Sequence, residues 1–267
     1  MSARVDINFM LGKRRIEFVM LTDAGNIADY NTMSAIEQDG CCEPEVARVM
    51  GRVVREGDAV IDVGANVGYF TLLLARLVGE RGSVIAFEPA QGSFSKLREN
   101  IRLNRLSHVS CMQQALWEKC EEVTLHQAAD SGQNSLARSP QSVGRTKINA
   151  TTFDAALTSH KARLLKIDVE GAEQNVMYGA KNLVPANVPY VVSELNDEAL
   201  TRFGHGNRSY RQLMMARGYD TFLIHADDAL PTLVPPATDL VQGWDQNVNV
   251  LFSTLDRVAE AWPEIPV

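Results

Sequence analysis

The chain has 267 residues, of which 45% are hydrophobic, and a formal net charge of -7 at pH 7. This length suits one large domain or two small ones, and the acidic balance argues against a protein that grips nucleic acid through its phosphates. No apolar run approaches the roughly 20 residues of a membrane span, and the N-terminus lacks the order of a signal peptide. We therefore expect a cytoplasmic protein that binds neither nucleic acid nor membrane.

The first 56 residues are expected to form an N-terminal extension and a helix. Arg15–Leu21 alternates loosely and precedes a turn at Asp23–Asn26, which is typical of a strand or a hairpin. Such a hairpin would serve equally well at a homodimer interface or as an edge of the same subunit. Residues 43–55 are predicted to be helical because apolar residues recur on one face, namely Val46, Val49, Met50 and Val53.

From residue 57 onward, apolar strands alternate with helices. This order predicts an α/β fold with a doubly wound, mostly parallel sheet of seven strands covered by helices on both faces, within a single domain spanning residues 1–267. The expected strands are 59–63, 83–87, 109–112, 164–169, 190–193, 219–224 and 248–252, and the expected helices are 67–78, 92–104, 149–157, 171–183 and 209–217.

Two stretches interrupt this alternation. Residues 118–150 contain a short alternating strand around Val123 and Leu125, followed by a polar loop over 129–144. Residues 225–246 are rich in proline and are expected to form a long excursion between the last two strands. Long loops in a compact domain are often functional, and a solvated insertion is the alternative for each.

The first strand runs into a glycine-containing turn and then into a helix, over Asp62–Tyr69. Glycines at this point let the backbone turn tightly and let a ligand approach the amides, and the helix N-terminus favours an anionic group. The spacing G-x-N-x-G differs from the G-x-G-x-x-G of a nicotinamide site, which disfavours a nicotinamide-dependent oxidoreductase. A plain connection between strand and helix is the alternative interpretation.

The second strand ends in Glu88 and Pro89. An acidic residue at this position can accept hydrogen bonds from both hydroxyls of an adenosine ribose. A glycine turn followed by such an acid therefore indicates an adenosine-containing ligand. The third strand leads to Gln113, Gln114 and Ala115, which we expect beside the adenine, although the two glutamines would equally suit solvent.

Acidic residues also follow the fourth and fifth strands. Asp168 and Glu170 come at the end of the fourth, with Lys166 on the same face, and Glu194 ends the fifth. Charged groups in an apolar strand are costly to bury without a partner or a function, so we expect a site at this edge. Glu170 and Glu173 also suit a helix N-terminus, and a structural ion pair to Lys166 is the alternative. His205, between two glycines, is a candidate base or an exposed loop residue.

Several strings in this order resemble the FkbM family of methyltransferases: VIDVGANVGYFTLLLA, VIAFEP, LRENIRLN, LLKIDVEGAEQNVMYGA and PYVVSELN. The resemblance implies the class I methyltransferase fold, S-adenosylmethionine as cofactor and S-adenosylhomocysteine as product. By position it implies that Asp62, Gly64, Asn66 and Gly68 hold the methionine end, together with their neighbours Ala65 and Tyr69. It further implies that Glu88 and Pro89 lie at the ribose, that Gln114 and Ala115 border the adenine, and that Asp168 and Glu170 face the methyl group.

The resemblance also implies O-methylation of a small molecule such as a sugar, a glycoside or a polyketide-type natural product. An alcohol needs a proton acceptor to act as a nucleophile, and the candidates are Asp168 or Glu170 first, then Glu194, then His205. A magnesium ion on Asp168 and Glu170 is a less favoured alternative, and the cysteines form no metal-binding pattern. The alternative functions are N-methylation of an amide or amine, an aminopropyl transferase, and a silent cofactor-binding module.

Overall fold

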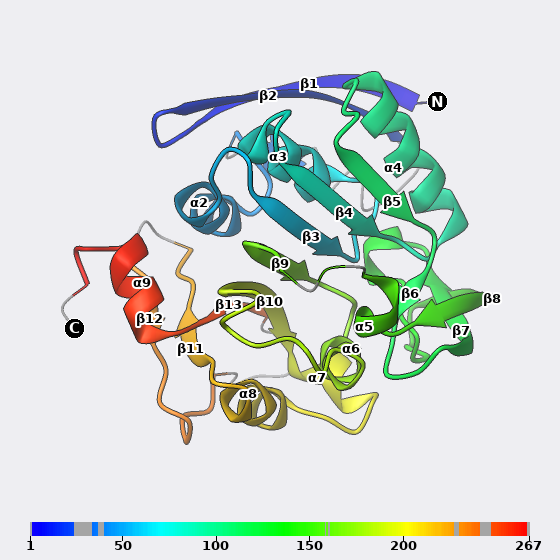
Figure 1. Ribbon diagram of the computed structural model, residues 1–267. Helices are drawn as coiled ribbons and strands as arrows, with labels where there is room; N and C mark the ends of the chain where they lie inside the picture. Colours follow the sequence, from blue (N-terminus) through cyan, green and yellow to red (C-terminus); the bar gives the residue numbers. More distant parts are fainter. Residues whose placement is uncertain are drawn as a thin grey trace.

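The structure is a computed structural model that describes residues 2–23, 34–36, 40–157, 159, 161–226, 230–240 and 247–265. Its centre is a sheet of eight strands in the order β12-β11-β13-β10-β9-β3-β4-β5 (Figure 1). The six strands β11, β10, β9, β3, β4 and β5 run parallel, while β13 and β12 are antiparallel to their neighbours. The predicted seven-stranded, mostly parallel sheet is confirmed, with β12 as one short addition.

The strand bounds follow the apolar runs of the sequence. The parallel strands are β3 (Ala59–Val63), β4 (Ser83–Phe87), β5 (Val109–Met112), β9 (Leu164–Ile167), β10 (Tyr190–Asn196) and β11 (Asp220–Leu223), and the others are β12 (Thr232–Leu233) and β13 (Asn247–Ser253). The central strands β3 and β9 are almost entirely buried because helices cover both faces, which explains their continuous apolar sequence.

Two hydrophobic clusters flank the sheet. One joins the hairpin, α2 (Pro44–Val53), α3 (Tyr69–Val78) and α9 (Leu255–Ala261) to one face, with α4 (Gln91–Leu103) beside them. The other joins α5 (Phe153–Ala156), α6 (Glu173–Tyr178), α7 (Asp197–Thr201) and α8 (Asn207–Ala216) to the opposite face. The doubly wound arrangement is therefore present. In the described residues no helix is long and apolar enough to cross a membrane.

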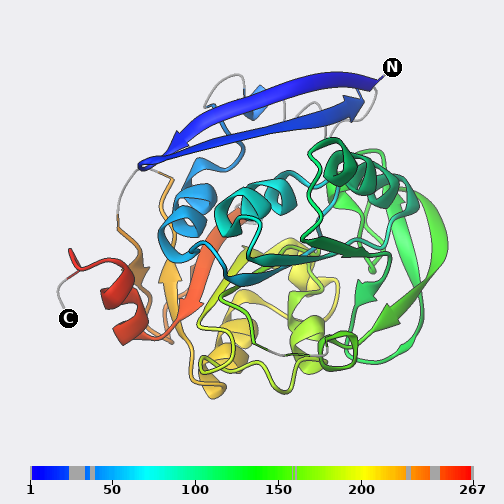
Figure 2. The ribbon, with the colours of Figure 1, turned by 45° about the horizontal axis from the view of Figure 1, so that its top comes forward.

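The N-terminal extension is a hairpin of β1 (Ser2–Leu11) and β2 (Arg14–Asp23) that lies over α2 and α3 (Figure 2). Its alternation buries Ile7, Ile16, Phe18 and Met20 against these helices. The hairpin turn lies at residues 12–13, between the two strands. The turn predicted at Asp23–Asn26 falls beyond β2, and residues 24–26 lie outside the described residues.

Two asparagines at the C-terminal end of α4 bind the hairpin: Asn100 in its last turn and Asn104 just after it. Asn104 accepts from the backbone N–H of Val19 at 2.9 Å and donates to the carbonyl of the same residue at 2.6 Å. Asn100 accepts from the N–H of Leu21 at 2.7 Å and donates to the carbonyl of Val67 at 2.9 Å. The side-chain amides of α4 thus satisfy backbone groups on the edge of β2, and Asn100 also reaches the turn after β3.

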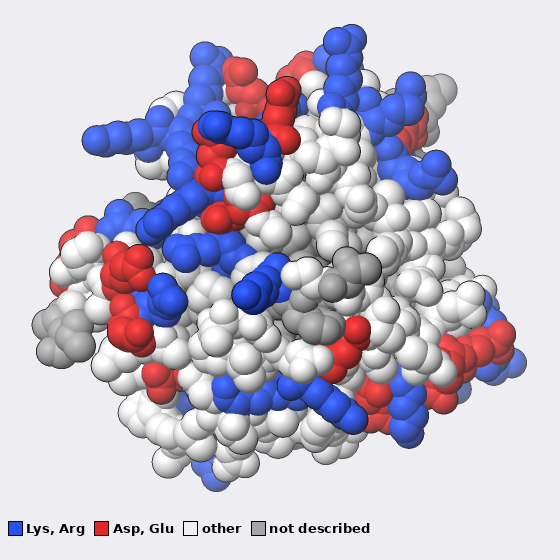
Figure 3. Space-filling model, in the orientation of Figure 1, with Lys and Arg blue, Asp and Glu red and all other residues white. Residues whose placement is uncertain are grey.

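Positive charge gathers on the hairpin. Arg4, Lys13, Arg14 and Arg15 are exposed there, and the Lys and Arg atoms stand out along the upper and left parts of the face in Figure 3. Because the net charge is -7, acidic groups must dominate elsewhere on the molecule. Two of these cations are paired with acids of the same hairpin, Arg4 with Asp6 at 3.4 Å and Arg15 with Glu17 at 2.7 Å.

The predicted strand around Val123 and Leu125 is present, and most of the polar loop predicted over 129–144 connects it to the next strand. Together with residues 115–116, the segment 118–150 forms a small second sheet. Its strands are β6 (Ala115–Leu116), β7 (Glu121–Ala128) and β8 (Ser142–Thr151), in the order β6-β8-β7, with a short 3-10 helix at Ser131–Gln133. The helix predicted over 149–157 is wrong at its start, because Asn149–Thr151 pair with β7 and β6, and only Phe153–Ala156 are helical.

Candidate active site

The turn between β3 and α3 is held in a conformation that its residue types permit. Gly64 and Gly68 have φ angles of 81° and 103°, and Asn66 has 48°. Left-handed backbone favours glycine and tolerates asparagine. A side chain on Gly64 would also collide with the carbonyl oxygen of Asp168. The glycine therefore allows the end of β9 to approach the turn closely.

Glu88 lies beside this turn at the end of β4. Its two carboxylate oxygens accept backbone N–H groups, from Asn66 at 2.8 Å and from Ala90 at 2.8 Å. The side chain is only 6% exposed. Burial raises the pKa of Glu88 to about 7, against the opposing effect of the two hydrogen bonds. Each oxygen retains acceptor capacity for a further donor.

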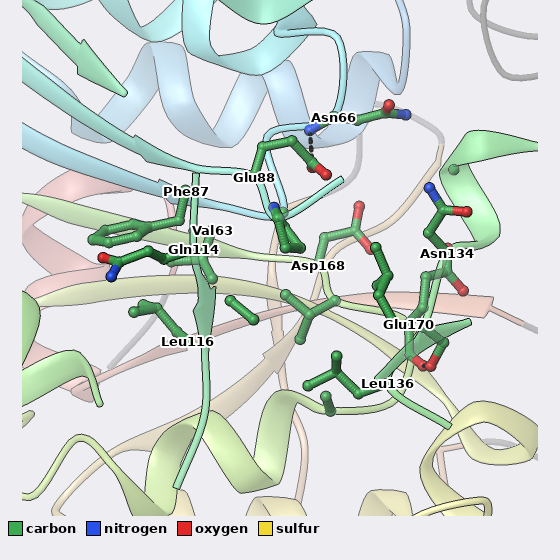
Figure 4. A pocket seen from close by; sticks show the side chains of 18 of the residues that line it. Val63, Asn66, Phe87, Glu88, Gln114, Leu116, Asn134, Leu136, Asp168 and Glu170 are labelled. Carbon is green, nitrogen blue, oxygen red and sulfur yellow. Dashed lines mark hydrogen bonds between the residues drawn. The ribbon is translucent and has the colours of Figure 1, made fainter. Parts of the chain in front are cut away.

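A pocket of about 700 Å³, including the solvent at its mouth, opens beside Glu88. Of the predicted cofactor residues, Gly64, Asn66, Glu88, Pro89, Gln114, Ala115 and Asp168 line it. In the view of Figure 4, Phe87, Gln114 and Leu116 lie at one end of the pocket and Asn134 and Glu170 at the other. The small second sheet closes one side with Leu125, Ser131, Asn134, Ser135 and Leu136. This insertion thus contributes to the site.

The remaining predicted cofactor residues lie behind the turn. Asp62 is fully buried and accepts a hydrogen bond of 2.6 Å from the hydroxyl of Thr71, and Tyr69 accepts one of 2.9 Å from the N–H of Cys42. Asp62, Ala65, Gly68 and Tyr69 do not line the pocket. The structure gives them positions that support the turn, and their predicted contact with the cofactor stays a prediction.

Asp168 is paired with a buried lysine. The Nζ atom of Lys166 donates to Oδ2 of Asp168 at 3.1 Å and lies 4.8 Å from the centre of the Phe70 ring. Burial works against the charge of Lys166, but Asp168, Asp62 and Glu43 together raise its pKa above the ordinary value. The predicted ion pair is present, and it leaves Asp168 about a third exposed in the pocket wall.

Glu170 has an unusual backbone conformation, with φ at 57°. The turn that presents it is fixed by Glu173, whose carboxylate accepts from the N–H groups of Val169 at 2.9 Å and Gly171 at 3.3 Å. Ser135 also donates to the carbonyl of Glu170 at 2.8 Å. Burial and the neighbouring charges of Asp168, Glu194 and Glu173 raise the pKa of Glu170 well above its ordinary value. Glu173 is therefore a structural acid, and Glu170 faces the pocket.

A second pocket of about 1200 Å³ adjoins the first and shares Asn66, Gly132, Asp168 and Glu170 with it. Its wall also contains Glu43 and Glu194. Burial raises the pKa of Glu43 to about 7 and that of Glu194 to about 8, and nearby Asp168 adds to both shifts. In the described residues, three of the four non-glycine positions with positive φ line this pocket: Glu43, Asn66 and Glu170. Such strained positions cluster at functional sites.

His205 lines neither of the two pockets, and its role as a base stays a prediction. Its ring packs edge-on against Tyr178, with the ring centres 5.9 Å apart. Its Nε2 atom is buried without a hydrogen-bond partner among the described residues, and burial lowers the pKa of the imidazole. The loop that carries it packs on α6 instead of turning toward the carboxylates.

The family model described as Methyltransferase FkbM domain matches residues 62–221, which is more than half of the chain. The matched region contains the last two residues of β3 and all of β4, β9 and β10, and it includes Glu88, Asp168 and Glu194. The chain belongs to the FkbM methyltransferase family. The resemblance expected from the sequence is confirmed, and the hairpin and α2 precede the matched region.

Individual methyltransferases resemble this chain over part of its length. Methyltransferase 1 of Beauveria bassiana (strain ARSEF 2860) is 26% identical over 161 residues, which cover 52% of this chain and 64% of that protein. The 23S rRNA (uracil(1939)-C(5))-methyltransferase RlmD of Psychrobacter arcticus is 33% identical over 69 residues, which cover 26% of this chain and 14% of that protein. The chain thus spans less than two thirds of the length of each of these relatives. The crystal structure of methyltransferase FkbM from Methylobacillus flagellatus KT superposes with a TM-score of 0.47 and 16% identity, covering 77% of this chain and 50% of that chain.

Some residues that line the two pockets come from outside the strand ends and were not predicted from the sequence. Glu43 lies at the start of α2, and Ser131 and Asn134 lie in the connection between β7 and β8. A hydrogen bond of 3.4 Å from Ser131 to Asn66 joins this insertion to the turn after β3. No local pattern marks these residues, because only tertiary packing places them there.

Proposed function

We propose that this protein transfers a methyl group from S-adenosylmethionine to a hydroxyl group of a small molecule. The observation that carries the proposal is the position of Glu88, which lies at the end of β4, is held by the turn after β3 and faces the first pocket. A buried carboxylate with free acceptor capacity suits the two hydroxyls of a ribose. When bound, S-adenosylmethionine supplies an electrophilic methyl group on a sulfonium sulfur.

The wall shared by the two pockets supports the assignment of the reacting group. Asp168 and Glu170 line both pockets, so an acceptor in the second pocket would meet the methyl group at these carboxylates. In such a transfer the acceptor oxygen would bond to the methyl carbon as the C–S bond breaks, and the electron pair of that bond would leave with the thioether. The hydroxyl proton passes to a carboxylate of the protein.

Glu170 is the base that we favour for this proton. Its raised pKa makes the ionised form a better proton acceptor near neutral pH than an ordinary glutamate. Glu194, whose pKa is raised to about 8, is the second candidate in the adjoining wall. Asp168, held by Lys166 at 3.1 Å, is placed to orient the hydroxyl. Positioning of this kind contributes a large share of catalysis in a two-substrate reaction.

Magnesium is the weaker alternative. In the described part of the chain, no three or more His, Cys, Asp or Glu side chains are grouped to hold a metal ion. Asp168 already has a cationic partner in Lys166. We therefore assign no step to a metal, and an acceptor screen with and without magnesium tests the alternative directly.

Calorimetric titration with S-adenosylhomocysteine, with NADH as the control ligand, tests the cofactor assignment. We expect micromolar binding of the first compound and none of the second. Preference for NADH, or no binding of S-adenosylhomocysteine, would overturn the proposal. A screen of hydroxyl-bearing and amine-bearing acceptors then separates O-methylation from N-methylation by the mass and fragmentation of the product.

A further inference from the structure

The second pocket is lined by an excess of carboxylates. Glu43, Asp130, Asp168, Glu170, Glu194 and Glu198 face Arg202, which is the single Lys or Arg among its lining residues in the described part of the chain. Arg202 is committed to Glu198, at 3.2 Å. Lys166 lies behind the wall and is committed to Asp168, at 3.1 Å. Neither cation forms an ion pair within 4.0 Å with Glu43, Glu170 or Glu194 among the described residues.

Three of the carboxylates have no ion-pair partner within 4.0 Å among the described residues: Glu43, Glu170 and Glu194. The carboxylates of Glu170 and Glu194 also accept no hydrogen bond from the described residues, and Glu43 accepts one of 3.4 Å from the amide of Asn249. Glu170 is partly buried, so water compensates its charge only in part. Partly buried carboxylates without partners are costly unless a ligand completes the site.

Close packing of these acids has an electrostatic consequence. The pKa values of Glu43 and Glu194 are raised to about 7 and about 8, chiefly by burial and in part by Asp168, and Glu43 adds to the shift at Glu194. A neutral ligand would leave these groups either protonated or repelling one another. A cation placed between them would favour their ionised forms and gain hydrogen bonds to charged acceptors, which are stronger than bonds between neutral groups.

We propose that the second pocket takes an acceptor that carries at least one ammonium group beside the hydroxyl that is methylated, as an amino sugar or an aminocyclitol does. The proposal rests on the function proposed above, which places the methyl group at the wall of Asp168 and Glu170. The ammonium group is bound by Glu43 and Glu194, on the side of the pocket away from Glu88. The pocket volume of about 1200 Å³, which includes solvent at its mouth, leaves room for a ring of this kind.

The ammonium group serves for binding and is not the methylated atom. Carboxylates around an ammonium group raise its pKa, so it keeps its proton and has no lone pair to attack a methyl group. The hydroxyl at the shared wall needs only partial loss of its proton in the transition state. The acid-rich wall therefore favours O-methylation of an amino alcohol over methylation of its nitrogen.

Binding of two matched probes tests this proposal. The full-length protein, saturated with S-adenosylhomocysteine, is titrated with 2-deoxystreptamine, a diaminocyclitol, and with myo-inositol, a cyclitol without nitrogen. We expect the diamine to bind at least about tenfold more tightly, with a preference that shrinks as salt rises. The proposal would be overturned by equal binding of the two compounds or by tighter binding of myo-inositol. It would also be overturned if neither compound bound at concentrations up to the millimolar range.

Two substitutions connect the preference to the pocket. Glu43→Gln and Glu194→Gln keep the shape of the side chain and remove its charge, so each is expected to reduce the preference severalfold. The double variant is expected to abolish it. Glu122→Gln, on exposed β7 and paired with Lys147, is the matched control and should retain the preference. Survival of the preference in the double variant would overturn the proposal.

Titration with S-adenosylhomocysteine in the same preparations separates the two levels of inference. If that compound fails to bind the wild-type protein, the proposed function fails and this inference fails with it. If it binds normally and the two probes do not differ, only the assignment of an ammonium-bearing acceptor is wrong. The variants at Glu43 and Glu194 should bind S-adenosylhomocysteine like the wild type, because neither residue lines the first pocket.

Discussion

The backbone N–H of Asn66 donates a hydrogen bond of 2.8 Å to the carboxylate of Glu88, which fastens the turn after β3 to the end of β4. The second oxygen of the same carboxylate accepts from Ala90. One side chain therefore both shapes the turn and faces the pocket. The assignment of Glu88 to the cofactor ribose rests on this arrangement, and a substitution of Glu88 tests the assignment.

Replacing Glu88 by alanine should weaken S-adenosylhomocysteine binding by at least about tenfold. The change removes charged acceptors for ribose hydroxyls, each such hydrogen bond being worth about 1.5–3 kcal/mol. Calorimetry measures the affinity, and circular dichroism with a thermal melt confirms that the variant is folded. Unchanged affinity in a folded variant would show that Glu88 does not hold the ribose.

Binding of S-adenosylhomocysteine near neutral pH should release protons. The pKa of Glu88 is raised to about 7 by burial, and hydroxyl donors would stabilise its ionised form and lower that pKa. At pH 7 about half a proton per site would leave. Titrations in phosphate and in Tris, which differ in ionisation enthalpy, measure this number. The same observed enthalpy in both buffers, after subtraction of the heats of dilution, would argue against the assignment, and Glu88→Ala provides the control.

The free energy of unfolding should fall as pH rises from about 4.5 to about 8. The pKa values of Glu43, Glu88 and Glu173 are raised to about 7 and that of Glu194 to about 8. In this range the native state holds protons that the unfolded chain has lost, so stability decreases with rising pH. Urea unfolding at several pH values measures the slope. Glu194→Gln should flatten it and Glu122→Gln should not; an equal slope in all three proteins would contradict the shift at Glu194.

Asp168→Asn should keep cofactor affinity within a few-fold of the wild type and lower turnover strongly.

Glu170→Gln should lower turnover by roughly 10²–10⁴-fold and remove the acidic limb of the pH–rate profile, because a base must be ionised to accept the proton. Steady-state kinetics over pH with an identified acceptor measures both effects. Full activity of the asparagine variant would take Asp168 out of the chemistry, and an unchanged acidic limb would reassign the base to Glu194.

Gly64→Ala should destabilise the fold by about 2 kcal/mol or more. A left-handed φ costs a residue with a side chain about 1–2 kcal/mol, and the new methyl group would collide with the backbone of Asp168. Gly92→Ala is the matched control, since it lies in α4 and a methyl group there meets no atom within 4 Å. That variant should be neutral or up to about 1 kcal/mol more stable. Equal thermal midpoints for the two variants would contradict the close approach.

The periodicity of the sequence predicted the sheet well because each central strand is a short apolar run bounded by turns. Glu88 and Asp168 were predictable for the same reason, since the ends of parallel strands meet at one edge. The helix expected at 149–157 failed because Asn149–Thr151 pair with neighbouring strands, and such pairing overrides local preference. Glu43 was not predictable, because its place in the site depends on tertiary packing. Its hydrogen-bond partner Asn249, in β13, is 206 residues away in sequence.

Asn100 links the N-terminal hairpin, which precedes the region matched by the family model, to the turn after β3. Its amide is fully buried between the N–H of Leu21 and the carbonyl of Val67. A chimera that exchanged residues 2–23 for another segment would have to present a backbone donor at the same point. Otherwise a buried amide oxygen would lack its partner, at a cost of about 1–3 kcal/mol next to the cofactor turn. Hairpin and catalytic core are therefore not freely interchangeable modules.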